Sequence, residues 1–353
     1  MGVIRVLLVD DSIIALTVLR KMFDSANDVE IVGTAKDGVE ALELIPKVSP
    51  NVICTDLHMP RMDGLQLTKE VMQRHPLPIL VVSVSVQDGD DDNIFRLLEA
   101  GAIDVFPKPR GGLDGNLDPF RTRELLSKVR ILSGVVPIRR HRRVTAGSGS
   151  SPQVVVRSGV SRPKLITIGA STGGPQAIME ILSDLPGDLA VPVVCIQHIS
   201  SGFLNEMVEW LNRHTPLKVT VAREGEAPKA GWVYFPPEDC HLTFDDQGRF
   251  ITRHEEQQDF FLESAPWHCP SVDVTFMSAL KAYGKDILAL LLTGMGKDGA
   301  EGMMAMTRSG CITVAQDEES CVVFGMPQQA IAMGGARHVL SLARMADFIR
   351  QNV

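Results

Sequence analysis

The stretch LITIGASTGGP, residues 165–175, gives the clearest indication of the fold. Its first four residues are apolar or β-branched and favour a strand, and the glycines that follow allow a tight turn. The pattern predicts a strand that turns directly into a helix, with Ser171 in the turn. Such a turn can hold a phosphate, present a nucleophile or only redirect the chain.

The glycine spacing distinguishes these three possibilities. A phosphate-binding loop needs G-x-x-x-x-G-K-[ST] or G-x-G-x-x-G, and residues 169–174 fit neither pattern and are followed by no lysine. Residues 169–173 match G-x-S-x-G, in which a serine is exposed on a sharp strand-to-helix turn. Ser171 is therefore a candidate nucleophile, and the N-cap of the helix is the alternative role that stays open.

A nucleophilic serine needs a general base and a group that orients the base. His198 follows the apolar strand VPVVCIQ, and Asp298 follows the most hydrophobic strand of this half of the chain, in LLLTGMGKDG. Ser171, His198 and Asp298 thus lie just beyond the carboxyl ends of predicted strands, where they can converge. Their order differs from the Ser–Asp–His order of α/β-hydrolases. His214 follows a helix and His241 lies in a loop-rich segment, so neither has this setting.

The pattern of strand and helix signals around this stretch predicts a doubly wound, Rossmann-like unit over residues 164–353. Apolar strand signals alternate with helix signals, which is typical of a parallel sheet covered on both faces. The strands are expected at 165–169, 192–197, 231–235, 287–293 and 311–315. The helices are expected at 174–185, 202–213, 271–283, 297–309 and 326–333.

The first part of the chain has the same alternation and predicts a second doubly wound parallel sheet. Its strands are expected at 4–10, 29–35, 51–57, 77–85 and 102–109, with a closing helix at 117–132. Residues 133–163 are rich in Ser, Gly, Pro and Arg, which predicts a flexible linker. We therefore expect domains at 1–125 and 164–353, joined by the end of the closing helix and the linker at 126–163. The charge runs Asp88–Asp92 and Arg139–Arg143 are interpreted as solvated.

Polar side chains end the strands of the first unit. Asp10 and Asp11 close the first strand, Asp56 the third, Ser83 the fourth and Lys108 the fifth. Three carboxylates at one sheet edge would repel each other unless a divalent cation lay among them, and oxygen ligands suit Mg²⁺. A lysine there neutralises a bound anion. Helix capping, the alternative role for a strand-end acid, would not account for the whole set.

Composition limits the class of protein. The 353 residues carry a net charge of −8, and 44% are hydrophobic and 22% charged, which argues for α/β cores and against a general affinity for nucleic acid. We find no apolar stretch of membrane-spanning length, and the start MGVIRVLLVDD turns acidic too early for a signal peptide. We expect a cytoplasmic protein with six reduced cysteines. A zinc site would have to use poorly spaced ligands from Cys240, His241, His254, His268 and Cys269.

The set of strand-end residues in the first unit resembles the receiver domain of two-component response regulators, over about residues 3–125. The resemblance implies a flavodoxin-like fold with Asp56 as the phosphoacceptor. It implies Mg²⁺ bound by Asp10, Asp11, Asp56 and the backbone at His58, and phosphoryl contacts from Ser83 and Lys108. Val105 stands where receivers often have an aromatic residue, and His58 is an unusual residue two positions after Asp56.

The second unit resembles the catalytic domain of the chemotaxis protein-glutamate methylesterases, the CheB family. The matching stretches are IGASTGGP, QHI, PSVDV, LTGMGKDGAEGM and AQDEESCVVFGMPQQAI, which lie within residues 164–350. By this resemblance Ser171 is the nucleophile, His198 the general base and Asp298 its orienting residue. Backbone N–H groups near Thr172 and Met295 would hold the oxyanion, and the domain would need no cofactor. Cys269 replaces a basic residue of the family.

Together the resemblances imply a hydrolase that is activated by phosphorylation and serves sensory adaptation. It would demethylate glutamate γ-methyl esters, and deamidate glutamines, on methyl-accepting chemotaxis receptors, with a chemotaxis histidine kinase as phosphodonor. Nucleic acid is not an expected partner, because no helix-turn-helix or basic helix follows the linker. Two alternatives stay open: the same esterase acting on a non-chemotaxis receptor array, or a phosphorylation-dependent binding module with a vestigial site.

Overall fold

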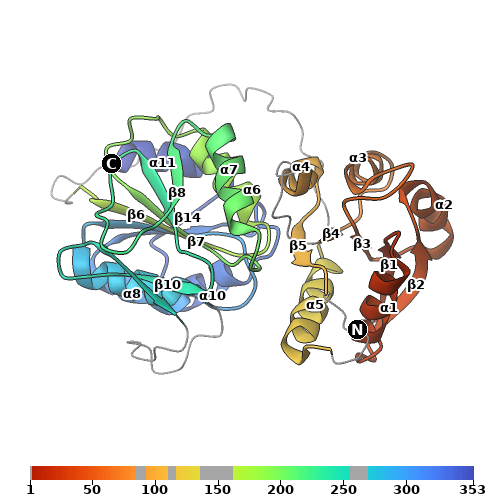
Figure 1. Ribbon diagram of the computed structural model, residues 1–353. Helices are drawn as coiled ribbons and strands as arrows, with labels where there is room; N and C mark the ends of the chain where they lie inside the picture. The colour runs from red at the N-terminus through yellow and green to blue at the C-terminus, as the bar shows by residue number, and fades with distance from the viewer. Residues whose placement is uncertain (1, 84–92, 110–116, 136–161, 255–268) are drawn as a thin grey trace, which may run out of the picture.

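Two parallel sheets, each with helices on both faces, form the protein (Figure 1). The computed structural model describes residues 2–83, 93–109, 117–135, 162–254 and 269–353. The predicted fold class of two doubly wound α/β units is confirmed. Both charge runs named above, and most of the predicted linker, lie outside the described residues.

The first unit is a five-stranded sheet in the order β2-β1-β3-β4-β5. Its elements are β1 (Ile4–Val9), α1 (Ile13–Phe23), β2 (Val29–Ala35), α2 (Gly38–Val48), β3 (Val52–Thr55), α3 (Gly64–Arg74), β4 (Ile79–Ser83), α4 (Asn93–Ala100), β5 (Asp104–Pro107) and α5 (Pro119–Leu132). This is the flavodoxin-like order, in which the chain reverses its direction of winding between β1 and β3. The carboxyl ends of those two strands therefore border a crevice, and Asp10 and Asp56 follow them.

The second unit is a seven-stranded parallel sheet in the order β14-β13-β12-β6-β7-β9-β8, with a separate antiparallel hairpin, β10-β11. Its first elements are β6 (Leu165–Ala170), α6 (Gly174–Ser183), β7 (Val193–Gln197), α7 (Leu204–His214), β8 (Lys218–Val221), β9 (Trp232–Phe235), β10 (Cys240–Phe244) and β11 (Phe250–His254). The remaining elements are α8 (Val272–Tyr283), β12 (Ile287–Leu291), α9 (Ala300–Ser309), β13 (Ile312–Gln316), α10 (Met326–Ala332), β14 (His338–Leu340) and α11 (Leu342–Asn352). Winding reverses between β6 and β12, so this unit also has a crevice at its sheet centre.

Helices of the second unit fall into two layers. Helices α7, α6 and α11 pack side by side on one face of the sheet, and α8, α9 and α10 pack on the other, with β10 beside α8 (Figure 1). Every residue of β6, β7 and β12 is buried, as their uninterrupted apolar sequences predict for strands covered on both faces. The three strands that border the crevice thus form the rigid centre of the unit.

Several elements were not predicted from the sequence. Strands β8, β10, β11 and β14 and helix α11 fall in segments that we interpreted as loops or left unassigned. The prediction that His241 lies in a loop-rich segment is wrong, because it lies within β10 and is fully buried. These strands have only three to five residues, and a short strand with polar residues gives little periodicity to detect. The helix predicted from residue 297 begins at Ala300, which leaves Asp298 in the preceding loop.

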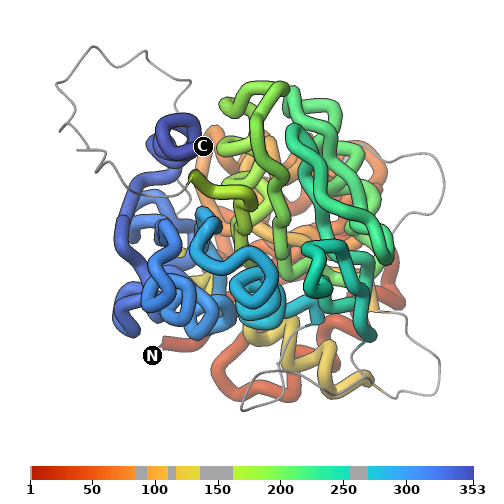
Figure 2. Tube along the Cα trace, turned by 90° about the vertical axis from the view of Figure 1, so that its left-hand side faces the viewer, coloured from red at the N-terminus to blue at the C-terminus, as the bar shows by residue number. Residues whose placement is uncertain are grey.

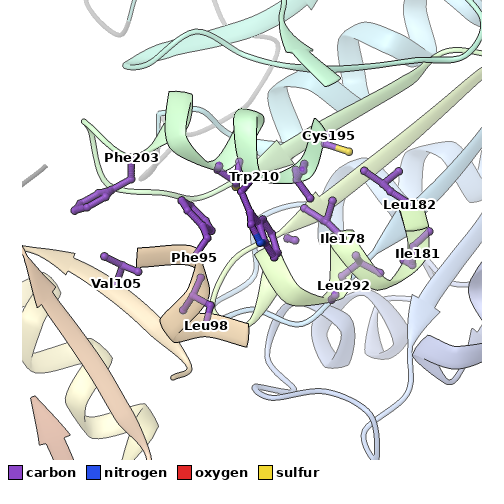
Figure 3. Close-up of a cluster of buried hydrophobic side chains, with 14 of the residues drawn as sticks. Phe95, Leu98, Val105, Ile178, Ile181, Leu182, Cys195, Phe203, Trp210 and Leu292 are labelled. Atoms are coloured by element: carbon purple, nitrogen blue, oxygen red, sulfur yellow. The ribbon is translucent and has the colours of Figure 1, made fainter. Parts of the chain in front are cut away.

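The two units pack against each other through a defined edge. Strand β5 and helices α4 and α5 face α6 and α7 (Figure 1), and Figure 2 shows the second unit in front of the first. Phe95 of α4 stacks on Trp210 of α7 with ring centroids 5.1 Å apart, inside a buried apolar cluster that spans both units (Figure 3). The indole N–H of Trp210 donates to Glu99 Oε1 at 2.7 Å. This interface buries apolar surface and pairs the indole N–H of Trp210 with a carboxylate oxygen.

Candidate functional site

Ser171 lies directly beyond the carboxyl end of β6, at the centre of the second sheet. The N-cap of α6 is Gly173, whose φ of 76° lies in the left-handed region, and no side chain caps this helix. Ser171 is therefore not a helix cap, and the turn leaves its side chain for another role. Gly294, after β12, approaches so closely that a Cβ there would lie 2.7 Å from Ser171 Cβ. The glycine lets the loop that follows β12 pass beside the serine.

His198 lies next to Ser171 because their strands are paired. The register of β6 and β7 matches Ala170 with Gln197, so Ser171 and His198 are the next positions on neighbouring strands. The backbone N–H of His198 donates to Ala170 O at 3.0 Å. The side chain of His198 is 10% exposed, so it is largely but not completely buried. The structure therefore brings these two predicted residues together at the sheet edge.

Asp298 completes the cluster from the loop between β12 and α9. Its Oδ2 lies 2.8 Å from His198 Nε2. This contact occupies one ring nitrogen of His198 and leaves Nδ1 as the nitrogen that can exchange a proton with the serine. The order serine, histidine, carboxylate is that of an acyl-transfer site, in which the carboxylate fixes the tautomer and orientation of the ring.

The Asp298 carboxylate is held by the start of α8. Its Oδ2 accepts from Val272 N at 2.7 Å, and its Oδ1 accepts from Asp273 N at 3.0 Å and Ser271 Oγ at 2.9 Å. Burial by itself would raise the pKa of Asp298, but hydrogen bonds from His198 and from the α8 N–H groups outweigh it and hold the pKa below its usual range. Asp298 is therefore ionised throughout the neutral range.

Three residues of this region were not proposed from the sequence as site residues. Ser271 and Asp273 belong to PSVDV, which we noted only as a matching stretch, and His241 was set aside. His241 Nδ1 accepts from Ser271 N at 3.1 Å, and Asp273 Oδ1 accepts from Gly302 N at 2.7 Å. Burial, together with the nearby charge of Asp298, raises the pKa of Asp273. A serine and an aspartate at the start of a helix are the sequence signal that could have identified Ser271 and Asp273.

The predicted oxyanion donors lie on both sides of Ser171. Thr172 follows it in the turn, and Met295 follows Gly294 in the loop after β12. Within the described part of the chain, the backbone N–H groups of Thr172 and Met295 donate no backbone–backbone hydrogen bond. Such N–H groups can bind a substrate oxygen.

The first unit contacts residues on each side of the serine. Thr172 Oγ1 donates to Asp104 Oδ2 at 3.1 Å, and Asp104 also forms an ion pair with Lys128. Gln176 Nε2 donates to Ala102 O at 2.9 Å. Two further contacts join Ser200 Oγ to Glu124 Oε1 at 3.2 Å and Ser127 Oγ to Met295 Sδ at 3.6 Å. The first unit thus touches residues beside all three parts of the candidate active site.

The acidic residues predicted in the first unit also converge. Carboxylate oxygens of Asp10, Asp11 and Asp56 lie within 4.8 Å of one another. Lys108 Nζ lies 2.8 Å from Asp10 Oδ2 and 2.9 Å from Asp56 Oδ2. Ser83 is buried at the end of β4, and its carbonyl accepts from Lys108 N. The arrangement places one cation among the carboxylates and leaves an all-oxygen donor set, which fits Mg²⁺.

Burial and charge set the ionisation of this cluster. Burial would lower the pKa of Lys108, but Asp10 and Asp56 raise it above its usual value. Burial raises the pKa of Asp10 in spite of its contacts with Lys108 and Ser12. His58 is exposed beside the cluster, and Val105 is buried in β5. Lys108 neutralises only one of the two buried carboxylates, Asp10 and Asp56, so the remaining negative charge favours the binding of a second cation.

The remaining sequence predictions concern cysteines, zinc and membranes. All six cysteines are free; Cys269 and Cys321 are only partly buried, whereas the other four are buried. Among the described residues the acidic cluster is the single group of His, Cys, Asp and Glu side chains with metal-binding geometry, so no zinc site is seen there. None of the helices in the described ranges has the length and apolar character needed to cross a membrane.

Comparison with known proteins gives two family matches. Residues 166–349 match the model of the CheB methylesterase family, and residues 6–113 match that of the response regulator receiver domain. The chain is 38% identical over 352 residues to a protein-glutamate methylesterase/protein-glutamine glutaminase of Hahella chejuensis. The matched region covers 98% of this chain and 97% of that protein. The chain is also 39% identical over 347 residues to a protein of the same name from Cupriavidus metallidurans, with 98% and 94% covered.

A solved structure gives the same relationship for the second unit. The CheB methylesterase catalytic domain of Thermotoga maritima is 34% identical and superposes with a TM-score of 0.50, covering 55% of this chain and 100% of that domain. The sequence match extends through both units, in the same order as in the full-length relatives. The chain therefore belongs to the CheB methylesterase family, in a form that carries a response regulator receiver domain before the methylesterase domain.

Proposed function

We propose that the protein hydrolyses glutamate γ-methyl esters on methyl-accepting chemotaxis receptors, and deamidates glutamines at such sites, under the control of phosphorylation at Asp56. The observation that carries the proposal is the hydrogen bond of 2.8 Å between His198 and Asp298, beside a serine on a strand-to-helix turn. The matched relatives are named for both activities. Such an arrangement is one that acyl transfer requires.

The reaction begins with the nucleophile. Ser171 Oγ attacks the ester carbonyl carbon while His198 Nδ1 takes the hydroxyl proton, and Asp298 stabilises the imidazolium through Nε2. His198 then returns the proton to the leaving oxygen, methanol departs, and a glutamyl ester of Ser171 remains. Water, deprotonated by His198, attacks this ester, which releases the glutamate carboxylate and restores the serine. With glutamine as substrate, the same steps release ammonia.

Two backbone N–H groups could stabilise the negative charge that develops on the ester carbonyl oxygen during the attack of Ser171. The backbone N–H groups of Thr172 and Met295 would bind the oxyanion from the two sides of Ser171, and the N-terminus of α6 adds a favourable dipole. Removing one such donor in a comparable site costs roughly 10²–10³ in rate. This arrangement requires the backbone at Gly294 to lie close to Ser171, so that the N–H of Met295 can point toward the substrate oxygen. A side chain at position 294 would collide with Ser171.

The receiver domain, which we place at residues 1–125, would act as a cover over the catalytic domain at 164–353. Its contacts to Thr172, Ser200 and Met295 occupy the surface that a receptor helix must reach. Phosphorylation of Asp56 would weaken this docking. Asp10, Asp11, Asp56 and the backbone at His58 would hold Mg²⁺, which neutralises phosphoryl oxygens, while Ser83 and Lys108 would contact the phosphoryl group.

The partners follow from this chemistry. A chemotaxis histidine kinase would donate the phosphoryl group, and the receptors would present their esters on the cytoplasmic side, where we place this protein. A net charge of −8 gives no general attraction to an acidic receptor segment, so recognition must come from local contacts.

The first prediction tests the nucleophile. Ser171→Ala should abolish methanol release from methylated receptor membranes while the protein stays folded, because no other group can form the acyl intermediate. We expect a loss on the order of 10⁴-fold or more. The measurement is methanol release in the presence of a small phosphodonor and Mg²⁺. Ser183→Ala, on the exposed end of α6, is the control and should keep full activity. Near-normal release by folded Ser171→Ala would overturn the assignment.

A further inference from the structure

Ser271 is the one residue at the start of α8 that gives Asp298 a side-chain hydrogen bond rather than a backbone one. Its Oγ lies 2.9 Å from Asp298 Oδ1, and the other two donors from α8 are backbone N–H groups. The carboxylate therefore has two donors on each oxygen, and those on Oδ2 include His198. Donors on both oxygens fix the plane of a carboxylate as well as its position.

Helix capping accounts for only one of the two hydrogen bonds that the Ser271 hydroxyl makes. Ser271 is the N-cap of α8, but its Oγ is 3.4 Å from Val274 N, a long distance for a hydrogen bond. The contact with Asp298 is shorter and involves a charged acceptor, which makes it the stronger of the two. The geometry thus favours the carboxylate as the main partner of this hydroxyl.

Ser271 is itself held from the opposite side. Its backbone N–H donates to Nδ1 of His241 at 3.1 Å, and both residues are almost completely buried, at 1% and 0% exposure. Burial lowers the pKa of His241 to about 4, so this ring is neutral and Nδ1 is an acceptor at neutral pH. Strand β10 therefore fixes the backbone of Ser271, and Ser271 in turn can fix Asp298.

We propose that Ser271 is a positioning residue for catalysis: its hydroxyl holds Asp298 Oδ1 so that Oδ2 faces His198 Nε2, and His241 holds Ser271 in place. The proposal rests on the proposed triad and adds two residues to it. Without the hydroxyl, Oδ1 keeps only the N–H of Asp273, and the carboxylate can rotate away from His198. Substrate contacts are not involved, so the chemical step should slow while substrate binding is unchanged.

The test uses the full-length protein and two readouts. One is the rate at which a fluorophosphonate labels Ser171, measured by mass spectrometry; the serine oxygen displaces fluoride from phosphorus, and His198 takes the serine proton. This rate depends on the activated serine and not on the identity of the receptor. The other is kcat and KM for methanol release with phosphodonor and Mg²⁺ present.

We expect Ser271→Ala to label roughly tenfold more slowly and to lower kcat by a similar factor with KM unchanged. Ser271→Thr, which keeps the hydroxyl, should restore both values to within about threefold of the original. Ser271→Gly should behave as the alanine variant does, because glycine caps a helix nearly as well as serine but has no hydroxyl. It serves as the decisive variant if Ser271→Ala does not fold.

Ser278→Ala is the matched control on the same helix. Its buried hydroxyl accepts from Phe244 N at 2.8 Å, two turns along α8 from Ser271, so its loss perturbs α8 without removing a donor from Asp298. Labelling at the original rate by Ser271→Ala and Ser271→Gly would overturn the proposal, as would an equal loss in Ser278→Ala. Wild-type protein that is labelled at Ser171 but releases no methanol would refute the proposed substrate and leave the role of Ser271 testable by labelling.

Discussion

At the residue scale, the active site depends on how buried polar groups are paired. Asp298 is ionised in a buried place because four donors surround it, and His241 is neutral because burial disfavours its charged form, while its Nδ1 accepts a backbone N–H. Each arrangement avoids the cost of an unpaired buried group, which is several kcal/mol for a charge. The stability of the site is therefore expected to depend on pH through these groups.

The second prediction concerns the pH dependence of stability at His241. Its pKa is about 4 in the folded protein against about 6.5 when unfolded, so the unfolded chain binds more protons between these values. The stability that neutral His241 contributes is complete above pH 6.5 and is lost as pH falls toward 4, by at most about 3 kcal/mol. Urea unfolding followed by tryptophan fluorescence measures this loss of stability. All three tryptophans lie between residues 210 and 267, in the same unit as His241, so the fluorescence reports on the unfolding of that unit.

The comparison variant for this prediction is His241→Asn, whose amide oxygen can accept the same N–H but does not titrate. The difference in unfolding free energy between wild type and His241→Asn should shrink or reverse as the pH is lowered from 6.5 to 4. A difference that stays constant over this range would show that His241 is not held in the neutral form.

At the scale of elements, α4 and α7 form the centre of the contact between the two domains. Phe95 stacks on Trp210, and Glu99 accepts the indole N–H of Trp210, which is 1% exposed (Figure 3). Strand β5 connects this interface to the proposed phosphorylation site, because Asp104 begins the strand and Lys108 follows its end. Val105 on the same strand is too small to act as an aromatic switch, so we expect the backbone of β5 and its neighbours to transmit the change.

The third prediction tests this contact. Glu99→Ala should raise the activity of the unphosphorylated protein severalfold, because the buried indole N–H loses its acceptor only in the docked form. An unsatisfied buried donor costs about 1–2 kcal/mol, which changes a population ratio by a factor of roughly 5–30. Glu99→Gln keeps an acceptor and should remain near the wild-type rate. Methanol release without phosphodonor is the measurement, and an unchanged rate in Glu99→Ala would exclude α4 from the inhibitory contact.

At the scale of the whole molecule, a covering domain on a linker can regulate without changing the active site itself. The sequence predicts a linker of about 30 residues, and a flexible coil of that length has a root-mean-square span of roughly 30 Å, which would let the receiver leave the catalytic face and return. Phosphorylation would then shift a docked–undocked equilibrium. If docking is favoured about tenfold, complete release raises activity by about the same factor.

The fourth prediction compares fragments and phosphorylation states. A fragment of residues 164–353 should hydrolyse receptor methyl esters faster than the unphosphorylated full-length protein, and the corresponding isolated domain of the Thermotoga relative is a folded unit. Phosphodonor with Mg²⁺ should accelerate the full-length protein but neither the fragment nor Asp56→Asn, whose amide cannot form an acyl phosphate. Equal rates for the fragment and the unphosphorylated full-length protein would mean that the receiver acts by recruitment to receptors instead of by covering Ser171.

The two parallel sheets and the residues at their strand ends could be predicted from the amino-acid sequence. Uninterrupted apolar strands between helices require a sheet covered on both faces, and the carboxyl ends of such strands share one edge. For this reason Ser171, His198 and Asp298 could be placed together, as could Asp10, Asp56 and Lys108. The short strands β8, β10 and β14 escaped prediction because three to five residues carry too little periodicity.

The orientation of these groups and the residues that surround them could be known only from the folded structure. Which nitrogen of His198 faces Asp298 depends on the path of the loop before α9, and the pairing of Ser271 with that carboxylate depends on where α8 begins. Both are contacts between segments far apart in the chain, on which local pattern carries no information. The docking of α4 on α7 could not be predicted either. The flexible linker that the sequence predicts would impose no orientation, so the side chains of the two surfaces select the faces that meet.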